Sequence, residues 1–220
     1  MTESRSTRAG KTKPASTAKR SSWGLSRKVV AAVGVGVLVL AAIYWNNTQS
    51  SAGKFRFAVG DPGPGKMAPP IRFSSPVLGT FDLAAQRGKS VLLYFQEGLM
   101  CQPCWDQIKD IEKNLDDFRG LGIDSIVSIT TDPAELLLQK MTDMALKTPV
   151  YSDPNLLVSR AYKTNDYGMM GDSYNGHSFI LVGPDGKIQW RADYGGAPDY
   201  TTFVPVKNLL ADLRRGLGKG

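Results

Sequence analysis

Two cysteines separated by two residues are the most distinctive chemical feature of this sequence. Cys101 and Cys104 enclose Gln102 and Pro103, and they are the only cysteines among 220 residues. Two thiols at this spacing can form a disulfide and exchange it with a partner. One pair is too few for a scaffold built on several bridges. The single histidine, His177, argues against a metal site made of several imidazoles.

The pair lies between two predicted elements. The apolar run at residues 91–95 predicts a buried strand, and apolar side chains at spacings of three and four predict a helix over residues 104–118. Free backbone N–H groups and the helix dipole at that N-terminus stabilise a thiolate, so Cys101 is the candidate nucleophile. Cys104, one turn further in, would be the resolving thiol. Pro103 removes an N–H that the helix could not pair and stiffens the turn.

Three alternatives apply to the cysteine pair. A purely structural disulfide across two residues would restrain little of the unfolded chain. Zinc would need two more ligands, for which the sequence offers His177 and carboxylates. Haem attachment requires a histidine after the second cysteine, where Trp105 stands. The sequence therefore favours redox or metal-exchange chemistry at this pair.

Glu97 is a further candidate because it lies four residues before Cys101. A carboxylate near a redox dithiol can relay protons to and from the thiols. The alternative is an acidic side chain that is simply solvated in a loop. The residues alone leave both open.

The elements that position these residues follow from the downstream pattern. Residues 123–129 predict a second strand, which gives a strand–helix–strand unit with a right-handed parallel crossover. Asp132-Pro133 and Asp153-Pro154 each predict a helix start, with the aspartate as cap and the proline at the first helical position. The remaining predictions are an antiparallel hairpin of residues 179–182 and 187–192 and a closing amphipathic helix at 204–217.

The basic charge of the chain is concentrated at its N-terminus. The net charge of +7 comes from 27 Lys and Arg residues and 20 Asp and Glu residues. Residues 1–28 hold eight of those basic residues and one of the acids, so the rest of the chain carries 19 of each. A nucleic-acid-binding domain needs its basic residues on a folded face. We therefore expect no nucleic-acid partner.

An uncharged run of 17 residues, 29–45, follows the basic segment. Its length is at the lower limit for a helix that crosses a lipid bilayer, and the positive-inside rule then places the preceding residues in the cytoplasm. A signal peptide cleaved at residues 50–52 is the alternative. We predict a single-pass protein of the cell membrane with four parts: a basic cytoplasmic tail (1–28), a transmembrane helix (29–45), a flexible linker (46–66) and an extracytoplasmic folded domain (67–220).

The folded domain resembles the thioredoxin-fold redoxins, the group that includes the alkyl hydroperoxide reductase/thiol-specific antioxidant proteins, peroxiredoxin-like proteins and membrane-anchored thiol–disulfide oxidoreductases. The resemblance covers roughly residues 57–215. It rests on Ala68-Pro69, the stretch 79–83, the strand leading to the cysteine pair, and the hairpin 179–186.

The resemblance implies an α/β thioredoxin-like fold, with a central mixed β-sheet flanked by helices, preceded here by the transmembrane helix. It also implies dithiol–disulfide exchange in which Cys101 attacks and Cys104 resolves, without a cofactor. The implied partner is a protein disulfide or thiol, or a peroxide, and the implied role is antioxidant or disulfide-reducing.

Two departures from the family pattern concern peroxide chemistry. Typical peroxiredoxins carry a proline and a hydroxyl residue shortly before the reactive cysteine, whereas residues 96–100 here are Gln-Glu-Gly-Leu-Met. Gly176-His177-Ser178 stands where such enzymes carry an arginine and where thioredoxins carry a cis-proline. Peroxidase activity is therefore an open question, and substrate docking must differ from that of thioredoxin.

His177 gives an alternative function. The loop before the late strand faces the cysteine pair in this fold, and the sequence from His177 to Gly186 also resembles the metal-binding loop of Sco-type copper chaperones. Two thiolates and an imidazole suit copper, so Cys101, Cys104 and His177 are an alternative ligand set. Those chaperones separate their cysteines by three residues rather than two. His177 could otherwise tune the dithiol or only form a hydrogen bond within its loop.

Overall fold

The computed structural model describes residues 27–49 and 53–219. The chain divides into two units, residues 1–44 and 45–220. The first unit contains most of helix α1 (Arg27–Gln49), whose side chains at residues 29–41 are exposed. No helix in the described residues is both long enough and apolar enough to cross a membrane. Residues 1–26 of the predicted tail, 50–52 of the predicted linker and residue 220 lie outside the described residues, as do the side chains of residues 27, 28 and 42–49.

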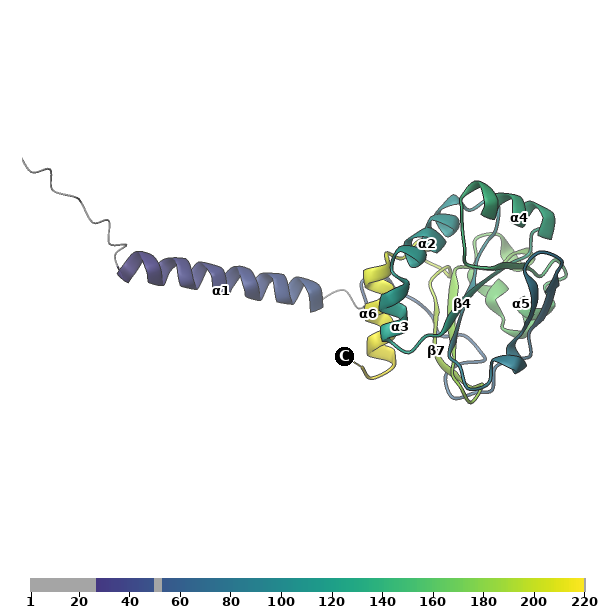
Figure 1. The fold of residues 1–220 in the computed structure, drawn as a ribbon, viewed down its shortest axis with the longest axis horizontal. Coiled ribbons are helices and arrows are strands. Elements are labelled where there is room, and N and C mark those ends of the chain that lie inside the picture. Colours follow the sequence, from purple (N-terminus) through teal and green to yellow (C-terminus); the bar gives the residue numbers. More distant parts are fainter. Residues whose placement is uncertain (1–26, 50–52, 220) are drawn as a thin grey trace, which may run out of the picture. The chain divides into compact units, whose positions relative to one another are not determined.

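A five-stranded mixed sheet forms the centre of the second unit, in the order β5-β4-β3-β6-β7 (Figure 1). Strand β3 pairs in parallel with β4 and antiparallel with β6. All five residues of β3 are buried, because both faces of the sheet are covered. This arrangement confirms the predicted mixed α/β fold. The strands are β3 (Val91–Phe95), β4 (Ser125–Thr130), β5 (Val150–Ser152), β6 (Ser178–Val182) and β7 (Ile188–Asp193).

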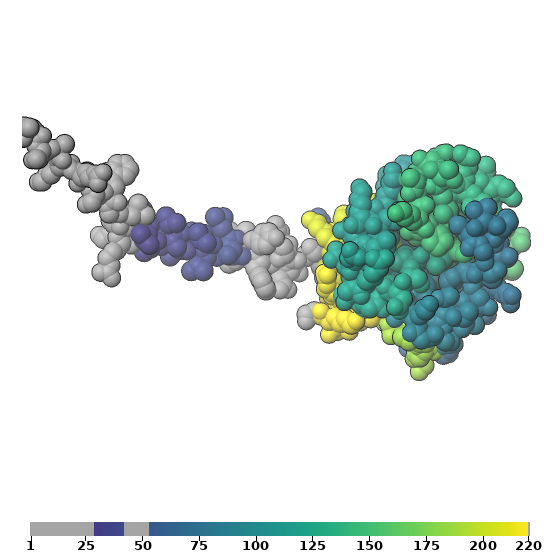
Figure 2. All heavy atoms as spheres, in the orientation of Figure 1, coloured from purple at the N-terminus to yellow at the C-terminus, as the bar shows by residue number. Residues whose placement is uncertain are grey.

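One face of the sheet is covered by helices. Side chains alternate along a strand, so Leu92 and Tyr94 of β3 point to this face and pack in one core cluster with Trp105 and Leu209. In Figure 2 the yellow spheres of α6 lie beside the teal spheres of the α2–α3 segment. The helices that contribute to this cluster are α2 (Gln102–Lys113), α3 (Leu115–Gly120), α4 (Ala134–Asp143) and α6 (Val206–Gly216).

The other face carries the second core cluster, which includes Leu93 and Phe95 of β3. It is covered by a two-stranded antiparallel hairpin, β1 (Arg72–Ser75) and β2 (Gly79–Asp82), and by α5 (Leu157–Ala161), with Val158 packed against the cluster. Three short 3-10 helices complete the unit: η1 (Leu83–Gln86), η2 (Thr164–Tyr167) and η3 (Gly171–Ser173).

Most predicted elements are confirmed within a few residues, including the parallel β3–α2–β4 unit, the β6–β7 hairpin and the closing helix α6. The helix predicted over 104–118 is divided at Asn114 into α2 and α3. The predicted cap Asp132 is wrong: Pro133 precedes α4, and the Asp132 carboxylate instead accepts hydrogen bonds from Leu99 and Thr130. Strand β5 was not predicted.

Residues within the predicted linker 46–66 run beside β7. Ala58 and Asp193 exchange both of their backbone hydrogen bonds, and Gly65 N–H donates to the Ile188 carbonyl. The backbone N–H of Gly60 donates to the Asp193 carboxylate at 2.8 Å. The edge of β7 is therefore lined by the chain that leads into the domain.

Candidate active site

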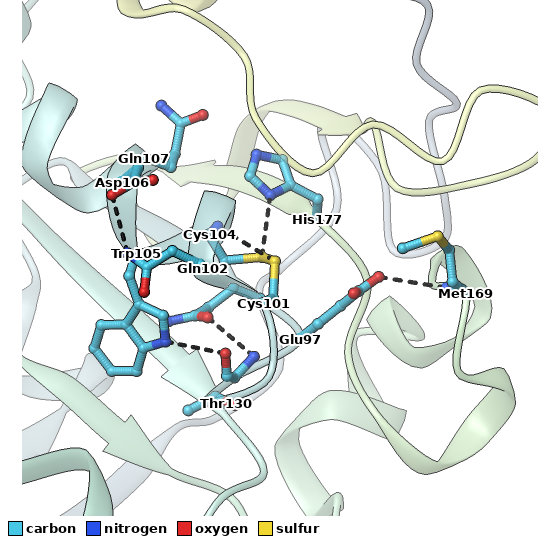
Figure 3. Close-up of a disulfide and its surroundings, with 12 residues drawn as sticks. Glu97, Cys101, Gln102, Cys104, Trp105, Asp106, Gln107, Thr130, Met169 and His177 are labelled. Carbon is cyan, nitrogen blue, oxygen red and sulfur yellow. Dashed lines mark hydrogen bonds between the residues drawn. A yellow bond between two sulfur atoms is a disulfide. The ribbon is translucent and has the colours of Figure 1, made fainter. Parts of the chain in front are cut away.

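The two cysteines form a disulfide at the N-terminus of α2 (Figure 3). Their Cα atoms are 5.3 Å apart. Cys101 is the N-cap residue, and its Sγ accepts a hydrogen bond from the backbone N–H of Cys104 at 3.2 Å. The same N–H also donates to the Cys101 backbone carbonyl at 3.0 Å, so it is shared between two acceptors of the N-cap residue. The helix terminus thus supplies a donor directed at the sulfur of Cys101.

The two sulfurs differ in their access to solvent. Cys101 is 7% exposed and Cys104 is completely buried. Gln102 and Pro103 between them are exposed, and Met100 is 90% exposed. Cys101 is therefore largely buried but lies beside exposed residues, whereas Cys104 has no exposed surface.

The loop before Cys101 is held by residues from two other elements. Gly98 has a φ of +90°, and a Cβ there would collide with the Asp132 carboxylate, so glycine is required. Asp132 accepts a 2.8 Å hydrogen bond from the Leu99 backbone N–H, and the Trp105 indole N–H donates to the Gly98 carbonyl at 3.0 Å. The position of Cys101 is thereby fixed relative to both β4 and α2.

Glu97 is 7% exposed, so it is not a solvated loop acid. Burial raises the pKa of its carboxyl group above the usual value, and the hydrogen bond from the backbone N–H of Met169, at 3.4 Å, opposes that rise. In Figure 3 the carboxylate points towards Met169 rather than towards the disulfide. Glu97 therefore links the end of β3 to the loop that contains Met169.

His177 lies immediately before β6 and is completely buried. Its Nδ1 is 3.9 Å from Cys104 Sγ and 3.0 Å from the hydroxyl oxygen of Tyr94 (Figure 3 shows the ring facing the disulfide). The single proton of the Tyr94 hydroxyl can go to this nitrogen or to the Cys104 carbonyl, which lies 3.3 Å from the hydroxyl oxygen. Burial lowers the pKa of His177 to about 3, so the imidazole is neutral at physiological pH. The structure thus brings His177 to the inner sulfur.

Two residues of this site were not predicted from the sequence. Tyr94 lies in an apolar run and was interpreted as core, although a hydroxyl on a fully buried side chain needs a partner. Asp132 was interpreted as a helix cap because a proline follows it. The sequence did contain a signal for Asp132, because it lies two residues after β4, which pairs in parallel with β3. The carboxyl ends of neighbouring parallel strands meet at the same edge of the sheet.

The alternative copper ligands Cys101, Cys104 and His177 lie together, with the two sulfurs bonded to each other. Within residues 27–49 and 53–219, no group of three or more His, Cys, Asp or Glu side chains is arranged to hold a metal ion. Copper binding stays a prediction.

Comparison with known proteins identifies the family. Residues 64–191, more than half of the chain, match the AhpC/TSA family. The chain belongs to the AhpC/TSA family. A Mycobacterium tuberculosis protein that carries a peroxiredoxin name is 32% identical to it over 159 residues, which cover 70% of this chain and 94% of that protein. As an AhpC/TSA protein with peroxiredoxin-like relatives, the chain is an oxidoreductase.

Solved structures of low sequence identity share the fold of this AhpC/TSA protein. The peroxidoxin BcpB of M. tuberculosis has a TM-score of 0.57 at 16% identity, covering 69% of this chain and 96% of BcpB. A Chlorobium tepidum protein named as the thiol:disulfide interchange protein DsbE has a TM-score of 0.54 at 18% identity, covering 73% of this chain and all of that one. The thioredoxin-like fold is therefore common to relatives named for peroxide and for disulfide chemistry.

Proposed function

We propose that the domain is a thiol–disulfide oxidoreductase that exchanges its Cys101–Cys104 disulfide with a protein partner. The observation that carries the proposal is the disulfide itself, set at the N-terminus of α2 with Cys101 beside exposed residues and Cys104 completely buried. A partner thiolate attacks the accessible sulfur, and a helix N-terminus stabilises the Cys101 thiolate that is formed or consumed there. The fold shared with one protein named for disulfide interchange supports this chemistry.

The exchange balances as two sulfur displacements. In the reducing direction, the Cys101 thiolate attacks a partner disulfide, a mixed disulfide forms and the partner's second sulfur leaves as a thiolate. The Cys104 thiolate then attacks Cys101 Sγ, the Cys101–Cys104 bond forms, and the first partner sulfur leaves. Two electrons pass from the domain to the partner. The oxidising direction is the reverse sequence.

The test is insulin-disulfide reduction by the full chain with dithiothreitol as electron donor. We expect Cys101→Ser to abolish the activity and to form no mixed disulfide. Cys104→Ser should accumulate a covalent mixed disulfide through Cys101. The proposal is wrong if the two variants reduce insulin as fast as the unchanged protein.

Peroxide reduction is the second candidate, and the peroxiredoxin-like relatives favour it. In that reaction the Cys101 thiolate takes one peroxide oxygen as a sulfenic acid, and Cys104 then displaces water to form the observed disulfide. The side chains of residues 96–100 carry no hydroxyl to orient a peroxide, and the Gln96 amide already pairs with Gly98 and Ser128. Stopped-flow oxidation of the reduced protein by hydrogen peroxide should therefore be slow, and fast saturating oxidation would favour the peroxidase.

The location of the domain forms a separate part of the proposal. We propose that residues 29–45 anchor the protein in the cell membrane, with residues 1–28 in the cytoplasm and the cysteine pair outside. The uncharged run of 17 residues and the preceding cations support this location. Alkaline carbonate extraction of membranes should leave the protein in the pellet, and protease added to spheroplasts should degrade the domain. Release by carbonate would overturn the anchor without affecting the redox proposal.

A further inference from the structure

The inner cysteine has a chemical requirement that its surroundings must meet. Cys104 is completely buried, and an apolar environment raises the pKa of a thiol. Cys104 must nevertheless lose its proton before it can attack Cys101 in a mixed disulfide. Because water does not reach Cys104 directly, a neighbouring group has to receive that proton.

His177 is placed to receive it. Its Nδ1 lies within 3.9 Å of Cys104 Sγ, which is contact distance for a hydrogen bond to sulfur. The Tyr94 hydroxyl, 3.0 Å from the same nitrogen, fixes the orientation of the ring, and Tyr94 and Phe179 pack edge-on against it. Nδ1 accepts the thiol proton in the tautomer whose ring hydrogen is on Nε2, with the Tyr94 hydroxyl donating to the Cys104 carbonyl. The proton acceptor is therefore directed at the inner sulfur.

The other ring nitrogen gives independent support. Nε2 of His177 is buried and has no hydrogen-bond partner in the described part of the chain. A buried ring nitrogen without a partner is costly, so a histidine at this position needs an explanation other than stability. Phenylalanine or leucine would fill the space without that cost. The feature that only histidine supplies here is a basic nitrogen next to Cys104.

Building on the proposed thiol–disulfide exchange, we propose that His177, oriented by Tyr94, is the base that takes the thiol proton of Cys104 during resolution of the mixed disulfide. The Cys104 S–H proton passes to Nδ1, and the thiolate 3.9 Å away stabilises the imidazolium, which offsets the burial that lowers the pKa of His177 in the disulfide form. The thiolate attacks Cys101 Sγ, and the Cys101–Cys104 bond forms as the partner's sulfur leaves. The proton then passes from the imidazolium to the departing thiolate. Once the disulfide has formed, burial favours neutral imidazole, which drives this last transfer.

Within the described residues, the groups that face His177 and Tyr94 come from four elements. Cys104 comes from α2, Tyr94 from β3 and Phe179 from β6, and the Tyr194 backbone after β7 donates to the His177 carbonyl. Glu97 acts on Tyr94, whose pKa is raised first by burial and second by this nearby carboxylate. Glu97 is therefore the competing base, although its carboxylate points to Met169.

The test separates the two displacements in one experiment. Reduced full-length protein is mixed with excess dithiobis(nitrobenzoate) in a stopped-flow instrument. A first release of thionitrobenzoate reports attack by Cys101, and a second release reports resolution by Cys104. The second phase should be absent in Cys104→Ser, and its absence would assign that phase to Cys104. A Cys101 phase that is missing altogether would instead contradict the proposed function.

We expect His177→Asn to slow the second phase by roughly a hundredfold, the usual contribution of a general base, with the first phase close to that of the unchanged protein. Asparagine keeps a polar atom near the position of Nδ1 but cannot take a proton. Tyr94→Phe should slow the second phase less, and Tyr162→Phe is its matched control, because that buried hydroxyl donates to the Pro69 carbonyl on the other face of the sheet. An unchanged second phase in His177→Asn, or its loss in Glu97→Gln instead, would overturn the proposal.

A second measurement does not depend on a variant at His177. His177 is the only histidine of the chain, so its imidazole signals in an NMR spectrum need no assignment. In the reduced protein we expect these signals to titrate together with Cys104, and the titration should disappear in Cys104→Ser. Imidazole signals that are insensitive to the state of Cys104 would contradict proton transfer between the two.

Discussion

Two buried polar clusters at opposite sides of strand β6 differ in how completely their atoms are paired. Near β3, the cluster of Tyr94, His177 and Cys104 leaves His177 Nε2 without a partner among the described residues. At β7, Arg191 and Asp193 form a doubly hydrogen-bonded ion pair, and both side chains are completely buried. The backbone of Gly60 donates to Asp193, and Arg191 donates to the Pro62 carbonyl.

This difference separates a reactive cluster from a structural one. A buried ion pair with its remaining donors and acceptors satisfied is rigid, and it joins the incoming chain to the sheet. A buried base with an unpaired nitrogen contributes little to stability, and its position beside a sulfur gives it a chemical role. Variants in one cluster should therefore leave the role of the other unchanged.

The largest expected effect is on the ion pair. Asp193→Ala leaves the Arg191 guanidinium buried without its partner, which should lower the free energy of unfolding by about 3–5 kcal/mol. Urea unfolding of the oxidised protein measures the change. The two thionitrobenzoate phases of the folded variant should be nearly unaltered. A loss below about 1 kcal/mol is typical of an exposed ion pair, and it would show that burial does not strengthen the structural role of Arg191 and Asp193.

The next effect is the pH dependence caused by His177. Its pKa is lowered to about 3 in the folded protein from 6.5, so between those values the unfolded chain binds a proton that the folded protein does not. Stability should therefore be complete above pH 6.5 and fall towards pH 3 with a slope approaching about 1.4 kcal/mol per pH unit from this residue. His177→Leu should remove that slope in urea unfolding measured across the range. An identical slope in the variant would show that the imidazole is not buried in the folded protein.

Glu97 should change the pH dependence of stability in the opposite direction from His177, and by a smaller amount. Burial raises its pKa above 4.5, so its contribution to stability is present below that pH and is lost as pH rises through the folded-state pKa. Glu97→Gln should therefore raise the urea midpoint at pH 7, with a difference that vanishes below pH 4.5. A variant that is less stable at pH 7 would indicate that the hydrogen bond from Met169 outweighs desolvation.

The smallest effect is expected at the surface. Arg56 and Asp199 form a 3.1 Å ion pair in which both side chains are largely exposed. Arg56→Ala should change the free energy of unfolding by about 0–1 kcal/mol, with the change reduced further by salt. This variant is the control for Asp193→Ala, since both remove one member of an ion pair. Similar losses in the two variants would mean that burial does not distinguish them.

Local sequence patterns predicted the secondary-structure elements of the folded unit well. The apolar run at 91–95, the spacing of Trp105, Ile108 and Ile111, and the turn after Val182 depend on neighbouring residues, and each element was found close to its predicted place. The position of Cys101 at a helix N-terminus followed from the same patterns.

Contacts between distant segments were not predictable in the same way. The pairing of Tyr94 with His177 joins residues 83 positions apart, and Asp132 reaches the cysteine loop only because β3 and β4 are neighbours. Arg191 and Asp193 did offer a signal. Residues two apart in a strand share one face, so an arginine and an aspartate at that spacing suggest a pair when that face is buried.

The segment that runs beside β7 has a consequence for association between molecules. An uncovered strand edge presents unpaired N–H and C=O groups that can template aggregation or accept an added strand. Residues 58–66 occupy the β7 edge, and the strand at the opposite edge, β5, is only three residues long. The chain's own residues therefore occupy positions at β7 that an added strand from another molecule would need.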